Sequence, residues 1–354
     1  MDAVMLVGGQ GTRLRPLTVN TPKPMLPTAG VPFITHQLAQ AREAGVDHVI
    51  LSTAYKPEVF SGHFGDGADL GIRLTYATED TPMGTGGAIR FVAEHLTGGD
   101  FLVFNGDVLS GLDIAALVAS HRSAAADVTL YLTEVEDARA FGCVPTDAEG
   151  RVSDFLEKMD RPVTNQVNAG CYVMSPAVLD RIPAGRPVSV ERETFPELLA
   201  AGAHLHGVVD TSYWLDLGTP AAFVRGSCDL VLGRVRSSAV PGPTGERLLL
   251  PGAQVAGDAQ VTGGTTVGRD AVVGAGAVVA GSVVFDGAVV ADGAVVRGSV
   301  VGVGARVGAG TVLDGVVVGD GAVIGAGNEL VVGARVWPGA VLGDGAVRFS
   351  SDRK

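Results

Sequence analysis

The 354-residue sequence has few cysteines, too few basic side chains to balance its acidic ones, and no long uninterrupted apolar run. Its three cysteines, Cys143, Cys171 and Cys228, are too few and too scattered for a disulfide framework or a metal cluster. We expect them to be buried thiols of a reducing compartment. The net charge of -12 argues against a nucleic-acid surface, so any bound anion must meet local cations.

We expect neither a secretory nor a membrane-spanning segment. The chain starts with the acidic Asp2 and a short apolar stretch, whereas a signal peptide has a basic start and a long apolar core. The later apolar stretches are interrupted by glycine and aspartate too often to span a bilayer. We therefore expect a cytoplasmic protein, and its length suggests two domains.

A glycine-rich segment with basic side chains follows the first apolar run. The run at 3–7 predicts a buried strand, because consecutive apolar residues suit a strand covered on both faces. The glycines of the following segment are Gly8, Gly9 and Gly11, and its basic residues are Arg13, Arg15 and Lys23. Glycines allow a tight turn that exposes backbone N–H groups, and such a turn beside cations predicts an anion-binding loop.

Two common phosphate-binding loops are excluded by the residues present. A Walker A loop needs Lys and Ser or Thr after its second glycine, but Thr12 and Arg13 follow Gly11. A Rossmann fingerprint needs a third glycine where Leu14 stands. The alternative is an ordinary strand-to-helix turn with solvated basic residues. Because the basic residues continue to Lys23 and four prolines stiffen the segment, we favour a loop that handles phosphate.

The sequence pattern changes near residue 230. Before that point, short apolar strands alternate with helical segments, which predicts an α/β domain with a mostly parallel sheet covered by helices on both faces. The predicted strands span 3–7, 48–53, 72–77, 101–105 and 127–135. Ligands bind at the carboxyl ends of such strands, where the glycine-rich segment begins.

Beyond a linker that contains proline and glycine, the sequence repeats every six residues. The hexads run from Val255 to Val296, and their frame slips before Val301 and again before Val318. Repeats of this kind predict a left-handed parallel β-helix, while valine at this density is too hydrophobic for a disordered linker. We therefore expect a Rossmann-like catalytic domain at 1–232, a linker at 233–250, a β-helix at 251–347 and a tail at 348–354.

Two aspartates are candidate ligands for a hard cation. Asp107, in FNGDVL, follows an apolar strand at the expected ligand-binding edge, and Asp216, in YWLDLGTP, precedes a glycine turn. Mg²⁺ typically takes one or two protein carboxylates together with phosphate oxygens and water. Either aspartate alone is more often a cap or turn residue. Combined with a phosphate loop, they favour the metal interpretation.

Two further segments carry candidate substrate contacts. Glu157 and Lys158 in FLEK, with Asn168 in NAGCYVMS, could bind a sugar and its phosphate, although FLEK could equally be a solvated surface pair. The turn made by Gly84, Thr85, Gly86 and Gly87 could let a flat base lie against the backbone. Spacing alone does not establish these roles.

Taken in order, the motifs resemble those of the nucleotidyltransferases that make nucleoside-diphosphate sugars. The matching segments are GGQGTRLRPLT with PKPMLP, GTGGAI, FNGD, FLEK, NAGCYVMSP, SVERETFPELL and YWLDLGTP. SVERETFP and the C-terminal hexads favour the mannose-1-phosphate guanylyltransferase branch over the short thymidylyltransferases. The resemblance covers nearly the whole chain, and the first motif is the most specific part of it.

The resemblance implies substrates and a role for each matching residue. The substrates would be GTP and mannose 1-phosphate, and the products GDP-mannose and pyrophosphate. The implied nucleotide contacts are Gly8, Gly9, Gly11, Thr12 and Asp107, with the turn Gly84, Thr85, Gly86 and Gly87 facing guanine. The implied catalytic residues are Arg13, Lys23 and Lys158, and the implied sugar-phosphate contacts are Gly142, Glu157, Lys158 and Asn168. Asp107 and Asp216 would hold Mg²⁺.

Three alternatives to this function remain. The chain could transfer UDP or dTDP onto glucose 1-phosphate, because the sequence identifies the base weakly. It could be a hexad acyltransferase, but those use a histidine on the β-helix and no histidine follows His206. It could also be a non-catalytic regulatory homologue, which the intact set of basic and acidic site residues argues against. The outer faces of the β-helix need covering, by another chain or by the catalytic domain, and we expect a homo-oligomer.

Overall fold

The computed structural model describes residues 1–156, 158, 160–331 and 333–348. The chain forms two compact units, one made of Met1–Gly9 with Gln37–Trp214 and the other of Gln10–His36 with Leu215–Lys354. The second unit therefore joins most of the glycine-rich segment to the C-terminal half. The domain boundaries that we predicted at 232 and 251 do not place residues 10–36 with the C-terminal half. These boundaries stay a prediction.

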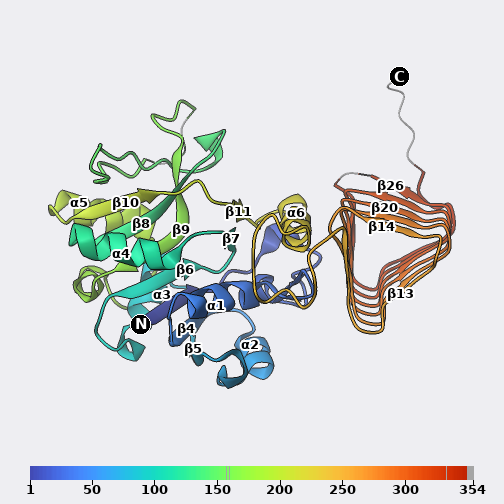
Figure 1. Ribbon diagram of the computed structural model, residues 1–354, viewed down its shortest axis with the longest axis horizontal. Coiled ribbons are helices and arrows are strands. Elements are labelled where there is room, and N and C mark those ends of the chain that lie inside the picture. The colour runs from blue at the N-terminus through green and yellow to red at the C-terminus, as the bar shows by residue number, and fades with distance from the viewer. Residues whose placement is uncertain (157, 159, 332, 349–354) are drawn as a thin grey trace. The chain divides into compact units, whose positions relative to one another are not determined.

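The first unit is built on a seven-stranded sheet in the order β10-β8-β9-β6-β1-β4-β5 (Figure 1). Its strands are β1 (Asp2–Leu6), β4 (His48–Thr53), β5 (Arg73–Thr78), β6 (Phe101–Asn105), β8 (Val128–Glu134), β9 (Gln166–Met174) and β10 (Leu205–Val209). Only β9 runs antiparallel to its neighbours. The predicted α/β class with a mostly parallel sheet is confirmed, and the predicted strands 48–53 and 101–105 match β4 and β6 residue for residue.

Helices alternate with these strands as the sequence pattern predicts. They are α1 (Phe33–Glu43), α2 (Pro57–Phe64), α3 (Gly84–Phe91), α4 (Ile114–Ala124), α5 (Phe195–Ala200), a π-helical turn (Val190–Thr194) and α6 (Pro220–Val231). Asp113 starts α4 by accepting a hydrogen bond from the Ala116 N–H at 2.9 Å. Fully buried side chains of the strands, such as Val4, Val103 and Leu130, form one hydrophobic core with side chains of α3 and α5. Within the described ranges, every helix is too short or too polar to cross a membrane.

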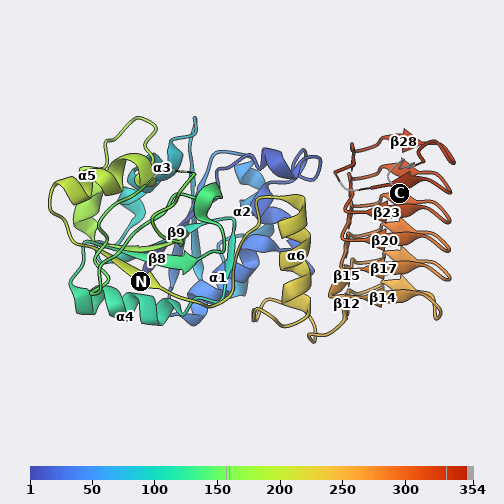
Figure 2. The ribbon, with the colours of Figure 1, turned by 90° about the horizontal axis from the view of Figure 1, so that it is seen from above.

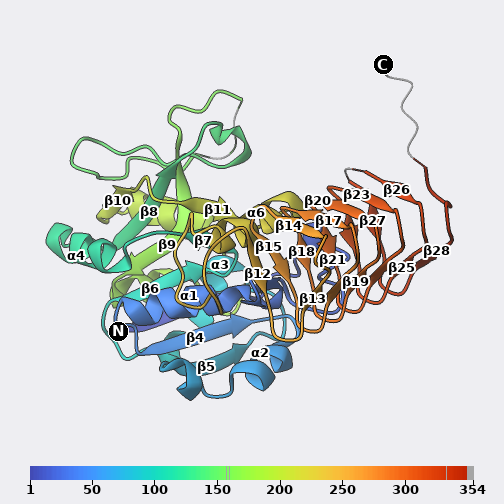
Figure 3. The same ribbon diagram turned by 45° about the vertical axis from the view of Figure 1, so that its right-hand side comes forward.

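The C-terminal half stacks its strands into three parallel sheets (Figures 2 and 3). The first sheet holds β12 (Arg247–Leu249), β15 (Thr265–Val267), β18 (Val283–Val284), β21 (Val300–Val301), β24 (Val317–Val318) and β27 (Arg335–Val336). The second holds β13 (Gln254–Val255), β16 (Val272–Val273), β19 (Val289–Val290), β22 (Arg306–Val307), β25 (Val323–Ile324) and β28 (Val341–Leu342). The third holds β14 (Gln260–Thr262), β17 (Val278–Ala280), β20 (Val295–Arg297), β23 (Val312–Asp314) and β26 (Glu329–Leu330). Three stacked parallel sheets confirm the predicted parallel β-helix.

The remaining short strands lie outside these sheets. They are β2 (Pro27–Thr28), β3 (Val31–Pro32), β7 (Val108–Ser110) and β11 (Trp214–Asp216). The strand β12 lies within the segment expected to be a linker, and it pairs with β15 from Arg247 to Leu249. Regular structure thus starts before the predicted start of the β-helix at 251.

The middle coils of the β-helix are one residue shorter than three hexads. Val279 pairs with Val296 and Val296 with Leu313, so each of these coils takes 17 residues. The core side chains include Val279, Val284 and Val290, so the frame shifts by one residue after Val279. The unbroken hexad frame that we predicted from Val255 to Val296 is therefore wrong over its last two repeats.

Buried serines occupy the shortened step of these coils. Ser282 accepts a hydrogen bond from the Ser299 N–H at 3.2 Å, and Ser299 accepts one from the Val316 N–H at 3.0 Å. Both serines are fully buried. Because a buried N–H needs an acceptor, a small hydroxyl at this step lets one coil follow the next without an orphaned backbone group.

Candidate active site

The glycine-rich segment folds back on itself immediately after β1. Gly11 has a φ of +59°, which glycine adopts without strain. A Cβ on Gly11 would lie 2.9 Å from the Cβ of Lys23, so a larger residue would push the two ends of the segment apart. The Thr18 hydroxyl donates to the Gly11 carbonyl oxygen at 2.8 Å and closes the same fold. This local closure keeps Lys23 beside the start of the segment.

Two predicted phosphate-binding cations lie against a predicted metal ligand. The Arg13 guanidinium and the Lys23 ammonium each lie 3.9 Å from a carboxylate oxygen of Asp216, one on each oxygen. The Lys23 side chain is largely buried, whereas that of Arg13 is 65% exposed. Gly218 makes the approach possible, because a Cβ there would overlap the Arg13 guanidinium. The fold thus joins residues from opposite ends of the predicted catalytic domain into one charged cluster.

Asp107 belongs to the first unit and follows β6 in a tight turn. The Gly106 N–H donates to the Leu6 carbonyl oxygen at 3.0 Å, which places this turn against the end of β1. Asp107 itself is half-buried. Among the described residues, no group of three or more His, Cys, Asp or Glu side chains is arranged to hold a metal ion. A shared ion on Asp107 and Asp216 stays a prediction.

The predicted sugar-binding residues come from segments that meet at Cys143. The Cys143 N–H donates to the Leu156 carbonyl oxygen at 2.9 Å, and Cys143 also bridges to Val167 in β9. These contacts bring Gly142, Lys158 and Asn168 onto neighbouring segments. Lys158 is exposed and Gly142 is half-buried. Glu157, the remaining predicted sugar contact, lies outside the described residues.

Sequence reasoning missed a hydrogen-bond chain that starts at Asn168. The Asn168 amide donates to the Tyr172 hydroxyl at 2.6 Å, and that hydroxyl donates to Glu191 at 3.3 Å. The other Glu191 oxygen accepts hydrogen bonds from Thr85 at 3.0 Å and Ser189 at 2.9 Å. Burial raises the pKa of Tyr172 well above its usual value, so its hydroxyl stays a donor. Tyr172 follows Asn168 by four residues on one strand, a spacing that returns to the same face.

The turn predicted to face a base makes several contacts of its own. The N–H groups of Gly86 and Gly87 donate to the Val188 carbonyl oxygen at 2.8 and 3.3 Å. The Thr85 hydroxyl accepts from the Val190 N–H at 2.9 Å. These groups hold the segment that carries Glu191. Reading of a base by this turn stays a prediction, and these two N–H groups are already engaged by Val188.

A buried glutamate next to this turn was also missed. The Glu79 carboxylate accepts hydrogen bonds from the Ser52 hydroxyl and the Met83 N–H, both at 2.8 Å. It also lies beside Gly8, where a Cβ would be 3.8 Å from one of its oxygens. Glu79 lines a cavity of about 380 Å³ together with Met83, Arg90 and others. The sequence signal that could have pointed to Glu79 is its position five residues before Gly84.

Comparison with known proteins identifies the family. Residues 2–231 match the family described as nucleotidyl transferase. The chain is 58% identical to a mannose-1-phosphate guanylyltransferase of Mycobacterium tuberculosis over 353 residues, which cover 99% of this chain and 98% of that protein. The chain belongs to the nucleotidyl transferase family. Proteins of this kind generally use a divalent metal.

Other relatives of this nucleotidyltransferase agree with the assignment. It is 36% identical to a mannose-1-phosphate guanylyltransferase catalytic subunit beta of Drosophila pseudoobscura over 75% of this chain and 70% of that protein. Residues 244–347 match the GMPPB C-terminal domain. A crystal structure of HddC from Yersinia pseudotuberculosis complexed with GMP-PN is similar with a TM-score of 0.56 and 28% identity, over 64% of this chain and 97% of that chain.

Proposed function

We propose that this nucleotidyltransferase joins mannose 1-phosphate and GTP to give GDP-mannose and pyrophosphate. The observation that carries the proposal is the 58% identity, over nearly the full length of both chains, to a mannose-1-phosphate guanylyltransferase. The charged cluster of Arg13, Lys23 and Asp216 supports it, because cations beside a carboxylate suit a metal-bound polyphosphate. The same identity makes a UDP- or dTDP-glucose enzyme, or a non-catalytic homologue, the less favoured functions.

The reaction requires positioning and charge neutralisation more than proton transfer. The phosphate of mannose 1-phosphate is already an anionic nucleophile, so its in-line attack on the α-phosphorus of GTP needs no general base. Negative charge grows on the departing pyrophosphate, and Arg13 and Lys23 are the cations proposed to stabilise it. On the sugar side, Lys158 would bind the phosphate of mannose 1-phosphate, while Gly142, Glu157 and Asn168 would contact the sugar.

Mg²⁺ is the divalent ion that best fits the proposed carboxylates. Mg²⁺ prefers oxygen ligands and usually binds through one or two carboxylates plus substrate phosphates. Asp216 offers a carboxylate whose neighbours, Arg13 and Lys23, can hold those phosphates. Asp107 offers the second. When bound, the ion would offset the charge of the triphosphate, while the two cations orient it.

Glu79 is our candidate for selecting guanine over other bases. Guanine presents N–H donors on its Watson–Crick edge, and a carboxylate can accept from two of them, as the amide of Gln cannot. The carboxylate of Glu79 is fixed by Ser52 and Met83, so it is preorganised to accept further hydrogen bonds on its remaining lone pairs. Its place beside Gly8 and the Gly84 turn supports a role at the base.

A pyrophosphate-release assay tests the whole assignment. Mannose 1-phosphate and glucose 1-phosphate would each be paired with GTP, ATP, UTP and dTTP. We expect the highest kcat/KM for GTP with mannose 1-phosphate. Glu79→Gln should lower kcat/KM for GTP by about 10-fold or more, since about 1–3 kcal/mol follows the loss of a well-placed hydrogen bond to a charged group. Higher activity with UTP or dTTP and glucose 1-phosphate would contradict the assignment.

We retain the prediction of a homo-oligomer. Exposed apolar side chains near the last coil support it, including Trp337, which is 52% exposed, and Val341, which is 72% exposed. Light scattering of the purified chain tests it, and a monomer at micromolar concentration would contradict it.

A further inference from the structure

One wall of the β-helix is buried on its outer face as well as its inner face. Val283, Val300 and Val317 stand at equivalent positions on β18, β21 and β24, and they are 2%, 0% and 3% exposed. Their sequence neighbours fill the interior of the β-helix, so these three valines point outward. Equivalent valines on the other walls, such as Val289 and Val295, are only half-buried. Among these described valines, those on β18, β21 and β24 are therefore covered by another part of the protein.

The cover includes the segment that carries the phosphate-binding cations. The three outward valines form one apolar cluster with Leu14, Leu17 and Leu26, together with Phe223 of α6 and others. Each of these leucines is at most 2% exposed. Leu14 directly follows Arg13, and Leu26 follows Lys23 by three residues. The apolar side chains of this segment therefore hold it on the β-helix, while Arg13 and Lys23 lie at Asp216.

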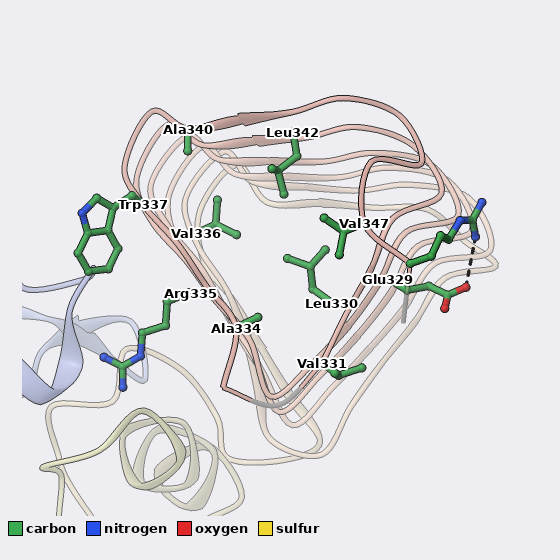
Figure 4. Close-up of a pocket in the computed structure, with 11 residues that line it drawn as sticks. Glu329, Leu330, Val331, Ala334, Arg335, Val336, Trp337, Ala340, Leu342 and Val347 are labelled. Carbon is green, nitrogen blue, oxygen red and sulfur yellow. Dashed lines mark hydrogen bonds and ion pairs between the residues drawn. The ribbon is translucent and has the colours of Figure 1, made fainter. Parts of the chain in front are cut away.

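The same row ends in an arginine that binds this segment directly. Val317 pairs with Arg335 on β27, so Arg335 occupies the next rung of the row. Its guanidinium donates to the Arg15 carbonyl oxygen at 2.6 Å. Figure 4 shows the Arg335 side chain directed away from the cavity of about 550 Å³ that Leu330 and Val336 line. At this position of the row the sequence has arginine where the coils of β18, β21 and β24 have valine. The arginine makes a hydrogen bond to the backbone of the segment, whereas the valines make apolar contacts.

We propose that this wall of the β-helix positions the catalytic site, and that Arg335 is a positioning residue for Arg13 and Lys23. Between β1 and α1 the chain has only two short 3-10 turns and the two-residue strands β2 and β3. Local hydrogen bonds, such as that from the Thr18 hydroxyl to the Gly11 carbonyl oxygen, shape the segment, whereas the leucine cluster and the bond from Arg335 attach it to the β-helix. Small displacements of catalytic groups lower rates strongly. The catalytic part of this inference rests on the proposed function.

The first test compares two exposed arginines on the β-helix of the full-length protein. Arg335→Ala should lower kcat about 5-fold, because the segment loses the hydrogen bond that helps to position it. The melting temperature should fall only slightly, because this bond lies at the exposed surface. Arg306→Ala, on β22 of another wall, is the matched control and should leave kcat unchanged. Arg335→Lys should recover part of the rate, since an ammonium can also donate to the Arg15 carbonyl. Equal rates for the Arg335→Ala and Arg306→Ala variants would overturn the proposal.

The second test does not depend on substrate identity. Hydrogen exchange of the backbone at 11–26 should become faster in Arg335→Ala, and also in Val300→Ala, than in the wild type. Val295→Ala, a half-buried valine of another wall, should leave that exchange unchanged. Unchanged exchange at 11–26, or an equal rise across the whole chain, would overturn the proposal. An inactive wild type with faster segment exchange in the variants would instead reject the proposed substrates and keep the positioning role.

Discussion

In the β-helix, polar side chains make the same contact to the backbone in successive coils. Around the sheet of the first unit, the polar networks do not follow such a repeat. Ser282 and Ser299 make the same backbone contact one coil apart, and Asp286 and Asp292 each accept a backbone N–H from the preceding coil. Glu191, by contrast, accepts hydrogen bonds from Thr85, Tyr172 and Ser189 in a network that does not follow a repeat. The repeated contacts stabilise the stack, and the network around Glu191 includes the predicted site residues Asn168 and Thr85.

The largest expected effect compares two aspartates, one from each setting. Asp107→Asn should lower kcat about 1,000-fold, because it removes charge from a proposed metal ligand. Asp292→Asn should leave kcat unchanged, since an asparagine oxygen can still accept the Ala275 N–H that Asp292 accepts at 2.9 Å. Steady-state rates at saturating Mg²⁺ measure both. Near wild-type activity of the Asp107 variant would reject its role at the metal.

The next prediction concerns the cation at the edge of the charged cluster. Arg13→Ala should raise the activation barrier by about 2–4 kcal/mol, because the guanidinium acts on charge that develops during the reaction. GTP affinity should change less than kcat. Comparison of kcat with the equilibrium dissociation constant for GTP decides the point. A loss confined to affinity would make Arg13 an ordinary binding residue.

A pH-dependent loss of stability is expected from His36, which is buried in the second unit. Its ring nitrogens lie 2.7 Å from the Ser237 hydroxyl and 2.9 Å from the Thr28 carbonyl oxygen. Burial lowers the pKa of His36 from 6.5 to about 4, and the hydrogen bond to Thr28 opposes this only in part. The unfolded chain therefore binds a proton more readily, and stability falls as pH drops from 6.5 towards 4, by up to about 3 kcal/mol.

Urea unfolding at pH 7.5, 5.5 and 4.5 measures this dependence. His36→Gln serves as the control, because glutamine cannot titrate yet can still donate to Thr28. The free energy of unfolding of this variant should fall less with acidification than that of the wild type. Parallel pH profiles for the two proteins would reject the assignment to His36.

A smaller loss of stability, with activity kept, is expected from the repeated serines. Ser299→Ala leaves the Val316 N–H without the acceptor that the structure gives it, which should cost about 1–3 kcal/mol of stability. The kcat should stay close to wild type, because Ser299 lies in the stack and not in the charged cluster. Thermal melting and the pyrophosphate assay measure the two effects. A selective loss of activity would contradict a purely structural role.

The smallest expected effect comes from the network around Glu191. Glu191→Gln keeps its shape but weakens the charged acceptor for Tyr172 and Thr85, so KM for mannose 1-phosphate should rise about 10-fold, as a loss of about 1.4 kcal/mol implies. The melting temperature should change little. A higher KM for GTP with an unchanged sugar KM would show that the network serves the nucleotide instead.

Local patterns were sufficient for the fold of each half. Short apolar runs with their polar flanking residues predicted β4 and β6 to the residue, since the buried centre of each strand leaves a clear apolar run. Valine every few residues predicted the β-helix. The frame shift after Val279 was missed, because adjacent valines such as Val283 and Val284 are indistinguishable until one is known to face inward. Glu79 and Glu191 were missed because a lone acidic residue carries no periodic signal.

The sequence by itself determined the two architectures, and it predicted the phosphate-handling loop and its cations, because each depends on residues close together in the chain. Only the tertiary structure decided which distant residues meet: Asp216 with Arg13 and Lys23, and Arg335 with the Arg15 carbonyl. In each of those contacts, the two partners lie about 200 or more positions apart in the chain. A sequence pattern indicates which residues are buried and how they repeat, but it does not indicate which distant residue they contact.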